Sequence, residues 1–265
     1  MVLQWLRCIN KSEVIHFYFL GSDIMYKDKI VLVTGASKGI GSAITTFFAK
    51  ESATIIMTYY SNLDLSNKTK DELISKYNVN IDNYYLDLSN EDSINELYKV
   101  INNKYGHIDI LINNASLSLD DEFNSLSKED FMKVLEVNTV GTFLMTKYMS
   151  KLMNKEGFIF NISSTDGIDT GSTLSINYNV SKAGINCMTE TLSRIIEPKI
   201  ITICPNWVET EVTKDMNQEY LINEMKRIDQ VKLIKPEKIP EVINEVINND
   251  CVSGSIIRID GDINE

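Results

Sequence analysis

Cysteine and histidine are scarce in this chain of 265 residues, which limits the sites that it can build. No CxxC pair and no metal-ligand spacing occurs among the four cysteines, which are Cys8, Cys187, Cys204 and Cys251. We expect reduced, mostly buried thiols in a cytoplasmic protein. The two histidines, His16 and His107, are too few and too far apart in sequence for a zinc site. The sequence therefore predicts no metal centre.

Positive charge is also in short supply. Lysine and arginine number 26 against 37 aspartates and glutamates, which gives a net charge of −11. A nucleic-acid backbone or an anionic membrane needs a basic face on its protein partner. We therefore expect neither nucleic acid nor a membrane as the main partner, and small ligands remain open.

Long hydrophobic runs are absent as well. The apolar run at residues 14–20 is too short to span a bilayer, and no small-residue cleavage site is obvious near it. Met25 begins "MYKDKIVLVTG", which is typical of a chain start directly before a strand. We expect residues 1–24 to be a dispensable arm or a mis-called start, with a cleaved signal peptide as the alternative.

From Lys29 onward, short β-branched runs alternate with amphipathic stretches, a pattern typical of a parallel sheet with helices on both faces. The predicted strands are Ile30–Thr34, Thr54–Tyr59, Ile81–Leu86, Ile108–Asn113, Phe158–Ile162, Ile200–Cys204 and Ser255–Ile259. The predicted helices are Gly39–Glu51, Lys68–Tyr77, Glu91–Tyr105, Lys128–Asn154, Ile176–Ile196, Thr213–Arg227 and Pro236–Asn248. No linker divides them, so residues 25–265 are predicted to form one α/β domain, a doubly wound Rossmann-type sheet of seven parallel strands.

The first predicted strand runs into "TGASKGIG", which places Gly35, Gly39 and Gly41 ahead of a helix. Glycines let the backbone approach a pyrophosphate, which then lies at the helix N-terminus. The GxxxGxG spacing differs from the commoner GxGxxG, and a glycine-rich turn is also the plain alternative. Its position after the first strand favours a dinucleotide site.

The choice between nicotinamide cofactors depends on charge near the adenosine ribose. An NAD site usually has an acid at the end of the second strand, whereas here the strand ends "MTYYSN". Lys38 would meet a 2′-phosphate, with Ser61 and Asn62 donating hydrogen bonds. We therefore favour NADP(H) over NAD(H), although Lys38 is also compatible with a solvated surface lysine, and Asp64 on a bent loop would favour NAD.

Tyr178 and Lys182 in "YNVSK" are four residues apart, so on a helix they share one face. A nearby cation lowers the pKa of a phenol and makes it a better base. Without other motifs, a buried tyrosine beside a surface lysine would be the simpler reading.

Several motifs occur together from Lys29 to the C-terminus, and the chain resembles the short-chain dehydrogenase/reductase family in them. They are "TGASKGIG", "LDLS", "NNAS", "VNTVGTF", "NISS", "YNVSK" and "CPNWVET". The resemblance implies hydride transfer between a nicotinamide and a carbonyl or alcohol, with a tetrad of Asn138, Ser164, Tyr178 and Lys182. In it, Tyr178 is acid or base, Ser164 binds the substrate oxygen, and Asn138 holds a water that leads protons to Lys182.

The resemblance, with the charge argument above, also implies the cofactor contacts. They are Gly35, Ser37, Lys38, Gly39, Ile40, Gly41, Ser61, Asn62, Asp87, Leu88, Asn114, Ala115, Tyr178, Lys182, Pro205, Val208 and Thr210. Lys182 would also hold the nicotinamide ribose, and Thr210 the carboxamide.

Some of these residues have plain alternatives. Asp87 is also a candidate helix cap, Thr210 a simple helix entry, and Asn138 a cap or packing residue. Ser163 and Thr165 compete with Ser164 for the serine role. Asn113 is interpreted as structural, tying its strand to its neighbours.

Asn206 stands where the family usually has glycine, and we expect it to keep the turn at positive φ. The region that follows, residues 207–232, mixes apolar and charged residues and is the predicted substrate loop. The 3-oxoacyl-carrier-protein reductases are the most similar group, which implies reduction of a 3-oxoacyl thioester and an acyl carrier protein as a further candidate partner. The alternatives are a sugar, polyol or small-alcohol dehydrogenase, and a catalytically silent cofactor-binding regulator. The family also implies a homotetramer or homodimer.

Overall fold

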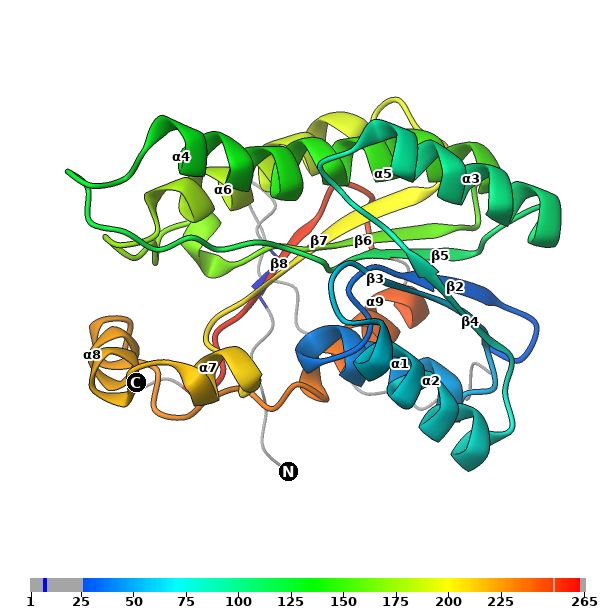
Figure 1. Ribbon diagram of the computed structural model, residues 1–265, viewed down its shortest axis with the longest axis horizontal. Helices are drawn as coiled ribbons and strands as arrows, with labels where there is room; N and C mark the ends of the chain where they lie inside the picture. The colour runs from blue at the N-terminus through cyan, green and yellow to red at the C-terminus, as the bar shows by residue number, and fades with distance from the viewer. Residues whose placement is uncertain (1–6, 9–25, 250, 263–265) are drawn as a thin grey trace.

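Short apolar runs form the strands of one sheet, in the order β1-β8-β7-β6-β5-β2-β3-β4 (Figure 1). The computed structural model describes residues 7–8, 26–249 and 251–262 of the chain. The strands are β1 (Arg7–Cys8), β2 (Ile30–Val33), β3 (Thr54–Tyr59), β4 (Ile81–Tyr85), β5 (Ile110–Asn113), β6 (Phe158–Ile162), β7 (Lys199–Pro205) and β8 (Ile256–Ile259). β2 to β8 run parallel, which confirms the predicted Rossmann-type sheet. β1 adds an antiparallel strand at the β8 edge.

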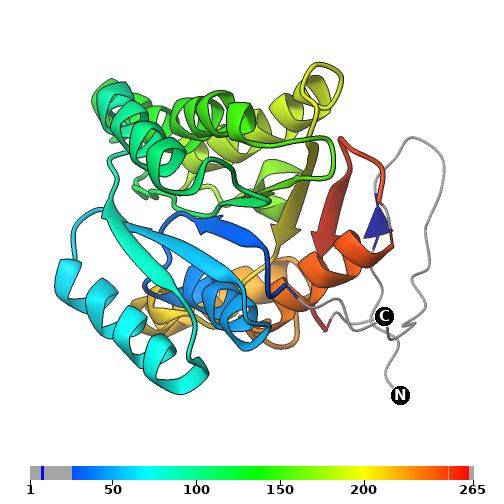
Figure 2. The ribbon, with the colours of Figure 1, turned by 90° about the vertical axis from the view of Figure 1, so that its right-hand side faces the viewer.

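Two layers of helices enclose this sheet (Figure 2). The helices are α1 (Gly39–Lys50), α2 (Leu63–Tyr77), α3 (Glu91–Tyr105), α4 (Lys128–Leu135), α5 (Gly141–Met149), α6 (Ile176–Leu192), α7 (Glu211–Asp215), α8 (Gln218–Arg227) and α9 (Lys238–Asn248). α1, α2 and α9 cover one face and α3 to α6 cover the other, whereas α7 and α8 lie at one end of the sheet, the same end as α4 (Figure 1).

The central strands are apolar throughout because both of their faces are buried. In β2, Val31 and Val33 pack with Phe48 of α1, while Leu32 between them packs into the opposite cluster with Met145 of α5. Full burial of each such side chain stabilises the fold by about 1.5–3 kcal/mol. Two apolar layers therefore fix the sheet, and the loops at the carboxyl ends of its strands are left for ligands.

Two helices depart from their predicted bounds because asparagine side chains cap them. α2 begins at Leu63 instead of Lys68, because the side chain of Asn62 accepts a hydrogen bond from the Leu65 N–H at 2.9 Å. The helix predicted at residues 213–227 is two helices, because Asn217 starts α8 by accepting from the Tyr220 N–H at 3.0 Å.

The helix predicted at residues 128–154 is a continuous run with changing pitch. α4 passes into a π-helical turn, η1 (Glu136–Val140), then into α5 and a 3₁₀ turn, η2 (Ser150–Leu152). α6 ends at Leu192, four residues before its predicted end. A π-helical turn inside an α-helix is frequent at functional sites, and this one carries Asn138.

The expectations about thiols and termini are only partly covered by the described residues. Cys204 and Cys251 are buried, and Cys187 is exposed. Most of residues 1–24, including the apolar run at 14–20, lies outside the described residues, so the hypothesis of a dispensable arm stays a prediction. Within the described ranges, no helix has the length and apolar character needed to cross a bilayer.

Candidate active site

The turn between β2 and α1 requires glycine at three positions. Gly35 and Gly39 have φ values of +63° and +53°, which disfavour other residues. A Cβ on Gly41 would lie 2.2 Å from the carbonyl oxygen of Gly35. Lys38 is the N-cap residue of α1, but its side chain makes no capping hydrogen bond, and the first turn of the helix has no acid. The first N–H groups of α1 therefore remain available as donors. This turn therefore fits the pyrophosphate of a dinucleotide.

The loop after β5 is tied to this glycine turn. The side-chain amide of Asn114 donates to the carbonyl of Thr34 at 2.9 Å and to that of Gly35 at 3.2 Å. The Thr34 hydroxyl accepts from the N–H groups of Asn114 and Ala115. Sequence reasoning missed Thr34, although a hydroxyl residue directly after an apolar strand was the available signal. Asn113 bonds Asn161 of β6 at 2.9 Å, which confirms its structural role.

The residues predicted at the adenosine ribose lie on the surface. Lys38, Ser61 and Asn62 are exposed, and Asn62 is also the cap of α2. Asp64 lies in the first turn of the same helix. An NADP(H) site at this end would rest on solvent-exposed charges, whose interactions are weak and screened by salt.

Asp87 and Leu88 follow β4 at the same end of the sheet. The carboxylate of Asp87 accepts hydrogen bonds from the N–H and the hydroxyl of Ser89, at 2.9 and 2.6 Å. Asn90 caps α3, so the interpretation of Asp87 as the cap is wrong. Leu88 is buried, and its carbonyl would lie 2.7 Å from a Cβ on Gly141, so this backbone packs closely on α5.

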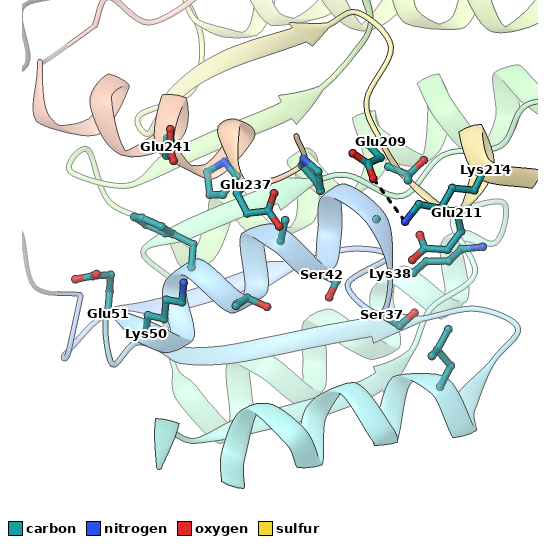
Figure 3. A pocket seen from close by; sticks show the side chains of 18 residues that line it. Ser37, Lys38, Ser42, Lys50, Glu51, Glu209, Glu211, Lys214, Glu237 and Glu241 are labelled. Carbon is teal, nitrogen blue, oxygen red and sulfur yellow. Dashed lines mark ion pairs between the residues drawn. The ribbon is translucent and has the colours of Figure 1, made fainter. Parts of the chain in front are cut away.

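Residues that follow β7 reach back to the glycine turn and close a pocket of about 620 Å³ beside it (Figure 3). A Cβ on Gly39 would lie 3.3 Å from Thr210 Cγ2. The N–H of Thr210 donates to the Thr213 hydroxyl at 2.9 Å, and Thr210 is the N-cap of α7. The interpretation of Thr210 as a helix entry is therefore confirmed. Pro205 ends β7 and Val208 is buried beside Ile234.

Tyr178 and Lys182 lie on one face of α6, as their spacing predicts. The Lys182 ammonium is 5.2 Å from the centre of the Tyr178 ring and donates to the carbonyl of Ile162 at 2.9 Å. Lys182 is only 2% exposed. Burial lowers the pKa of this ammonium to about 8. At neutral pH Lys182 is therefore still mostly protonated, but a small rise in pH removes its charge.

The pKa of Tyr178 is raised in this structure, whereas we expected the lysine to lower it. Burial raises the pKa of Tyr178, and the carboxylates of Asp166 and Asp120 raise it further. The lowering that we expected from the Lys182 cation does not contribute to this shift, whose largest cause is desolvation of the phenolate. Tyr178 therefore holds its proton at neutral pH, which suits a proton donor.

Three hydroxyl residues follow β6, and their partners distinguish them. Ser163 donates to the Lys182 carbonyl at 3.1 Å, and Thr165 donates to the side-chain oxygen of Asn206. The Ser164 oxygen accepts from the N–H of Asp166 at 3.1 Å. The Ser164 hydroxyl also donates to the Asp166 carboxyl, whose pKa this bond lowers. Of the three, Ser164 is therefore the one whose hydroxyl is bound to neither the α6 backbone nor Asn206, and we expect it to donate to a substrate.

A 3₁₀ turn, η3 (Thr165–Gly167), follows Ser164 and packs on α6 through Gly167. A Cβ on Gly167 would lie 2.6 Å from the carbonyl carbon of Lys182, so only glycine allows this approach. On the other side of α6, buried Asn138 donates to the Ser181 hydroxyl at 2.9 Å and to the Leu117 carbonyl at 2.8 Å. Its side-chain oxygen accepts from the Leu117 N–H at 2.7 Å. Tyr178 and Lys182 therefore lie on α6, Asn138 bonds a residue of the same helix, and Ser164 directly precedes the turn that packs on it.

Asn206 does not have the backbone conformation that we expected. It is not among the residues with positive φ, so the prediction that it replaces a glycine there is wrong. Its buried side chain accepts from Thr165 and lies 3.3 Å from a carboxylate oxygen of Asp260. The Asn206 side chain is held by a polar network that joins the ends of β6, β7 and β8.

Comparison with known proteins agrees with this geometry. A family model described as short chain dehydrogenase matches residues 29–221. The chain is 35% identical over 242 residues to the 3-oxoacyl-[acyl-carrier-protein] reductase FabG of Thermotoga maritima, covering 88% of this chain and 96% of that protein. It is 31% identical to glucose 1-dehydrogenase 2 of Bacillus subtilis, covering 89% and 96%. A short-chain dehydrogenase/reductase from Serratia marcescens shares the fold, with a TM-score of 0.83, 22% identity and coverage of 89% and 98%.

Proposed function

The chain belongs to the short-chain dehydrogenase family, whose members are oxidoreductases of C=O and CH–OH groups, and we propose that it reduces a ketone with NADPH at Tyr178. The observation that carries the proposal is the pairing of buried Lys182 with Tyr178 on one face of α6, with Ser164 at the end of β6, the strand whose Ile162 carbonyl accepts from Lys182. Asn138 fixes the opposite side of that helix.

Each side chain has a defined task in this proposal. The Ser164 hydroxyl donates to the substrate oxygen, where negative charge develops during reduction. Tyr178 gives its proton to that oxygen, and takes it back in the oxidation direction. The Lys182 cation stabilises the phenolate left behind, and the remaining lone pair of the Asn138 oxygen is the place for the proposed water. When bound, a nicotinamide cofactor supplies or accepts the hydride.

NADPH is the proposed cofactor because of the charge at the adenosine end. The glycine turn and the α1 N-terminus hold the pyrophosphate, and Lys38, Ser61 and Asn62 hold the 2′-phosphate. Asp64, in the first turn of α2, is the feature that supports NADH instead. The other cofactor contacts stay as the sequence predicts them, with Asp87 and Leu88 at the adenine and Thr210 at the carboxamide.

A 3-oxoacyl thioester, carried on an acyl carrier protein, is the first substrate class to test. It rests on the 35% identity to the Thermotoga maritima reductase. A hydroxylated ketone or sugar is the second class, supported by the carboxylates of Asp120 and Asp166, whose charges act on Tyr178. Both would bind in the space between α6 and the substrate loop at residues 207–232.

One assay tests this proposal. Oxidation of NADPH and NADH is followed with 3-oxoacyl thioesters, sugars and small ketones, in parallel with cofactor binding by fluorescence. The proposal expects faster turnover with NADPH and at least one ketone class. Binding of NADPH with no turnover across the whole panel would instead support a catalytically silent regulator.

We also propose that the chain self-associates through the outer face of α4, η1, α5 and α6. This face exposes a row of apolar side chains, which are Met132, Val140, Phe143 and Val180. Exposed apolar groups gathered in this way are typical of a protein interface. Sedimentation at micromolar concentration tests it, since a monomer would contradict the proposal.

A further inference from the structure

Asp166 lies beside the proposed reaction centre and has no role in the chemistry described above. It is two residues beyond Ser164, inside η3, and its N–H donates to the Ser164 oxygen at 3.1 Å. This hydrogen bond fixes the backbone of Asp166 next to the group that holds the substrate oxygen. The side chain of Asp166 therefore starts from a backbone position adjacent to the serine that is proposed to hold the substrate oxygen.

The carboxyl group of Asp166 is only partly satisfied by the protein. The Thr170 hydroxyl lies 3.0 Å from Oδ1, and it has a second partner in the Thr165 hydroxyl at 2.7 Å. A hydroxyl has one hydrogen and cannot donate to both at once. The Ser164 hydroxyl is the other side-chain partner of Asp166, so two hydroxyls of the same segment serve a carboxyl that can accept about four hydrogen bonds.

Cations that would pair with Asp166 are engaged elsewhere. Arg227 of α8 donates to the carboxylate of Glu224 at 2.7 Å and to the carbonyl of Thr170 at 2.6 Å. Lys182 donates to the Ile162 carbonyl. Over the described residues, no ion pair involves Asp166.

The Asp166 carboxyl interacts electrostatically with groups on both α6 and α8. Its charge acts on Tyr178 and Lys182 of α6, and on Tyr220 and Arg227 of α8. Burial raises the pKa of Asp166 and the Glu224 charge adds to this, whereas the hydrogen bonds from Thr170 and Ser164 and the Arg227 charge offset only part of it. A half-buried carboxyl with free acceptor positions is stabilised by a further hydrogen-bond donor.

We propose that Asp166 is a specificity-determining residue, whose carboxyl accepts a hydrogen bond from a hydroxyl on the carbon next to the reacting carbonyl. This inference rests on the proposed ketone reduction. It ranks the hydroxylated substrate class above ketones of the same shape that carry only CH₂ or CH₃ groups there. A 3-oxoacyl thioester has CH₂ at that position, so it gains nothing from Asp166.

Two small ketones of nearly equal shape test the inference. Hydroxyacetone carries a hydroxyl where 2-butanone carries a methyl group. We expect kcat/KM of the wild type with NADPH to favour hydroxyacetone roughly 10- to 100-fold, the range for a hydrogen bond to a charged group. In Asp166→Ala this ratio falls to about 1 because the acceptor is gone, whatever the change in the absolute kcat/KM for the two ketones.

Asp169→Ala is the matched control. Asp169 lies three residues further along the same segment, is 61% exposed at its side chain and pairs with Arg258. We expect this variant to keep the wild-type preference. If Asp166→Ala does not fold, as judged by circular dichroism, Asp166→Asn keeps the side-chain volume and must lower the preference, because a neutral amide oxygen accepts a weaker hydrogen bond than a carboxylate.

The outcomes separate the inference from the function on which it rests. A wild-type ratio near 1, or an unchanged ratio in the folded Asp166 variant, overturns the role of Asp166 and leaves ketone reduction standing. No turnover of any ketone with either cofactor overturns both.

Discussion

The two ends of the proposed site differ in how firmly the protein holds them. At the catalytic end, Ser164 and Lys182 are buried, and they have defined hydrogen-bond partners. At the adenosine end, Lys38 and Ser61 are exposed, and Asn62 is occupied with capping α2. Burial amplifies electrostatic effects and exposure weakens them. Substitutions at the catalytic end should therefore have large effects on rate, and those at the adenosine end should have modest effects on cofactor choice.

The largest expected effect is that of Tyr178→Phe. Removal of the hydroxyl keeps the ring and its packing but removes the proton donor, so kcat should fall roughly 10²- to 10⁴-fold. Binding of NADPH, measured by fluorescence titration, should change little. Tyr148→Phe is the control, because that hydroxyl bonds Glu91 on an outer helix. Wild-type turnover in Tyr178→Phe would show that another group supplies the proton.

A large effect on the pH dependence of stability is expected from Lys182. Its pKa is about 8 in the fold against an ordinary value of 10.5, so the unfolded chain binds more protons than the folded chain between these pH values. Stability should therefore rise with pH across this window, by on the order of 3 kcal/mol from this group. Denaturant unfolding of wild type and Lys182→Met measures the difference. If the free energy of unfolding depends on pH in the same way in both proteins, folding does not lower the pKa of Lys182, and this part of the account is wrong.

A smaller effect is expected for Lys38→Ala. Loss of this exposed charge should weaken NADPH binding roughly tenfold and leave NADH binding unchanged, since NADH lacks the 2′-phosphate. Lys68→Ala is the control, because Lys68 is an exposed lysine on α2 whose nearest carboxylate, Glu72, is 4.0 Å away. Equal weakening for both cofactors would place Lys38 at the pyrophosphate instead.

The smallest effect is expected at Asn62. Asn62→Ala removes the α2 cap and should cost about 1 kcal/mol of stability, whereas Asn62→Asp keeps a capping oxygen and should cost little. The aspartate also places a negative charge where the 2′-phosphate is proposed, so it should shift preference toward NADH. Thermal unfolding and paired cofactor titrations measure both effects. An aspartate variant with unchanged cofactor preference would remove Asn62 from the cofactor site.

The features that the sequence predicted correctly are mostly local ones. The glycine turn and the pairing of Tyr178 with Lys182 depend on neighbours within a few positions, so spacing alone was enough. The failed prediction for Asn206 depends on distant partners, since Thr165 and Asp260 lie 41 and 54 positions away. Asp166 was missed for the same reason. The surroundings of its side chain depend on residues that are distant in sequence, and no local pattern predicts them.

The central claim is that hydride passes between a nicotinamide and a ketone carbon beside Tyr178. NADPH carrying deuterium at C4 of the nicotinamide, in each of its two stereochemical forms, is supplied with the ketone that gives the highest kcat/KM. With one form, mass spectrometry should find deuterium on the carbinol carbon of the product, and with the other form none. An alcohol product free of deuterium with both forms would contradict the account.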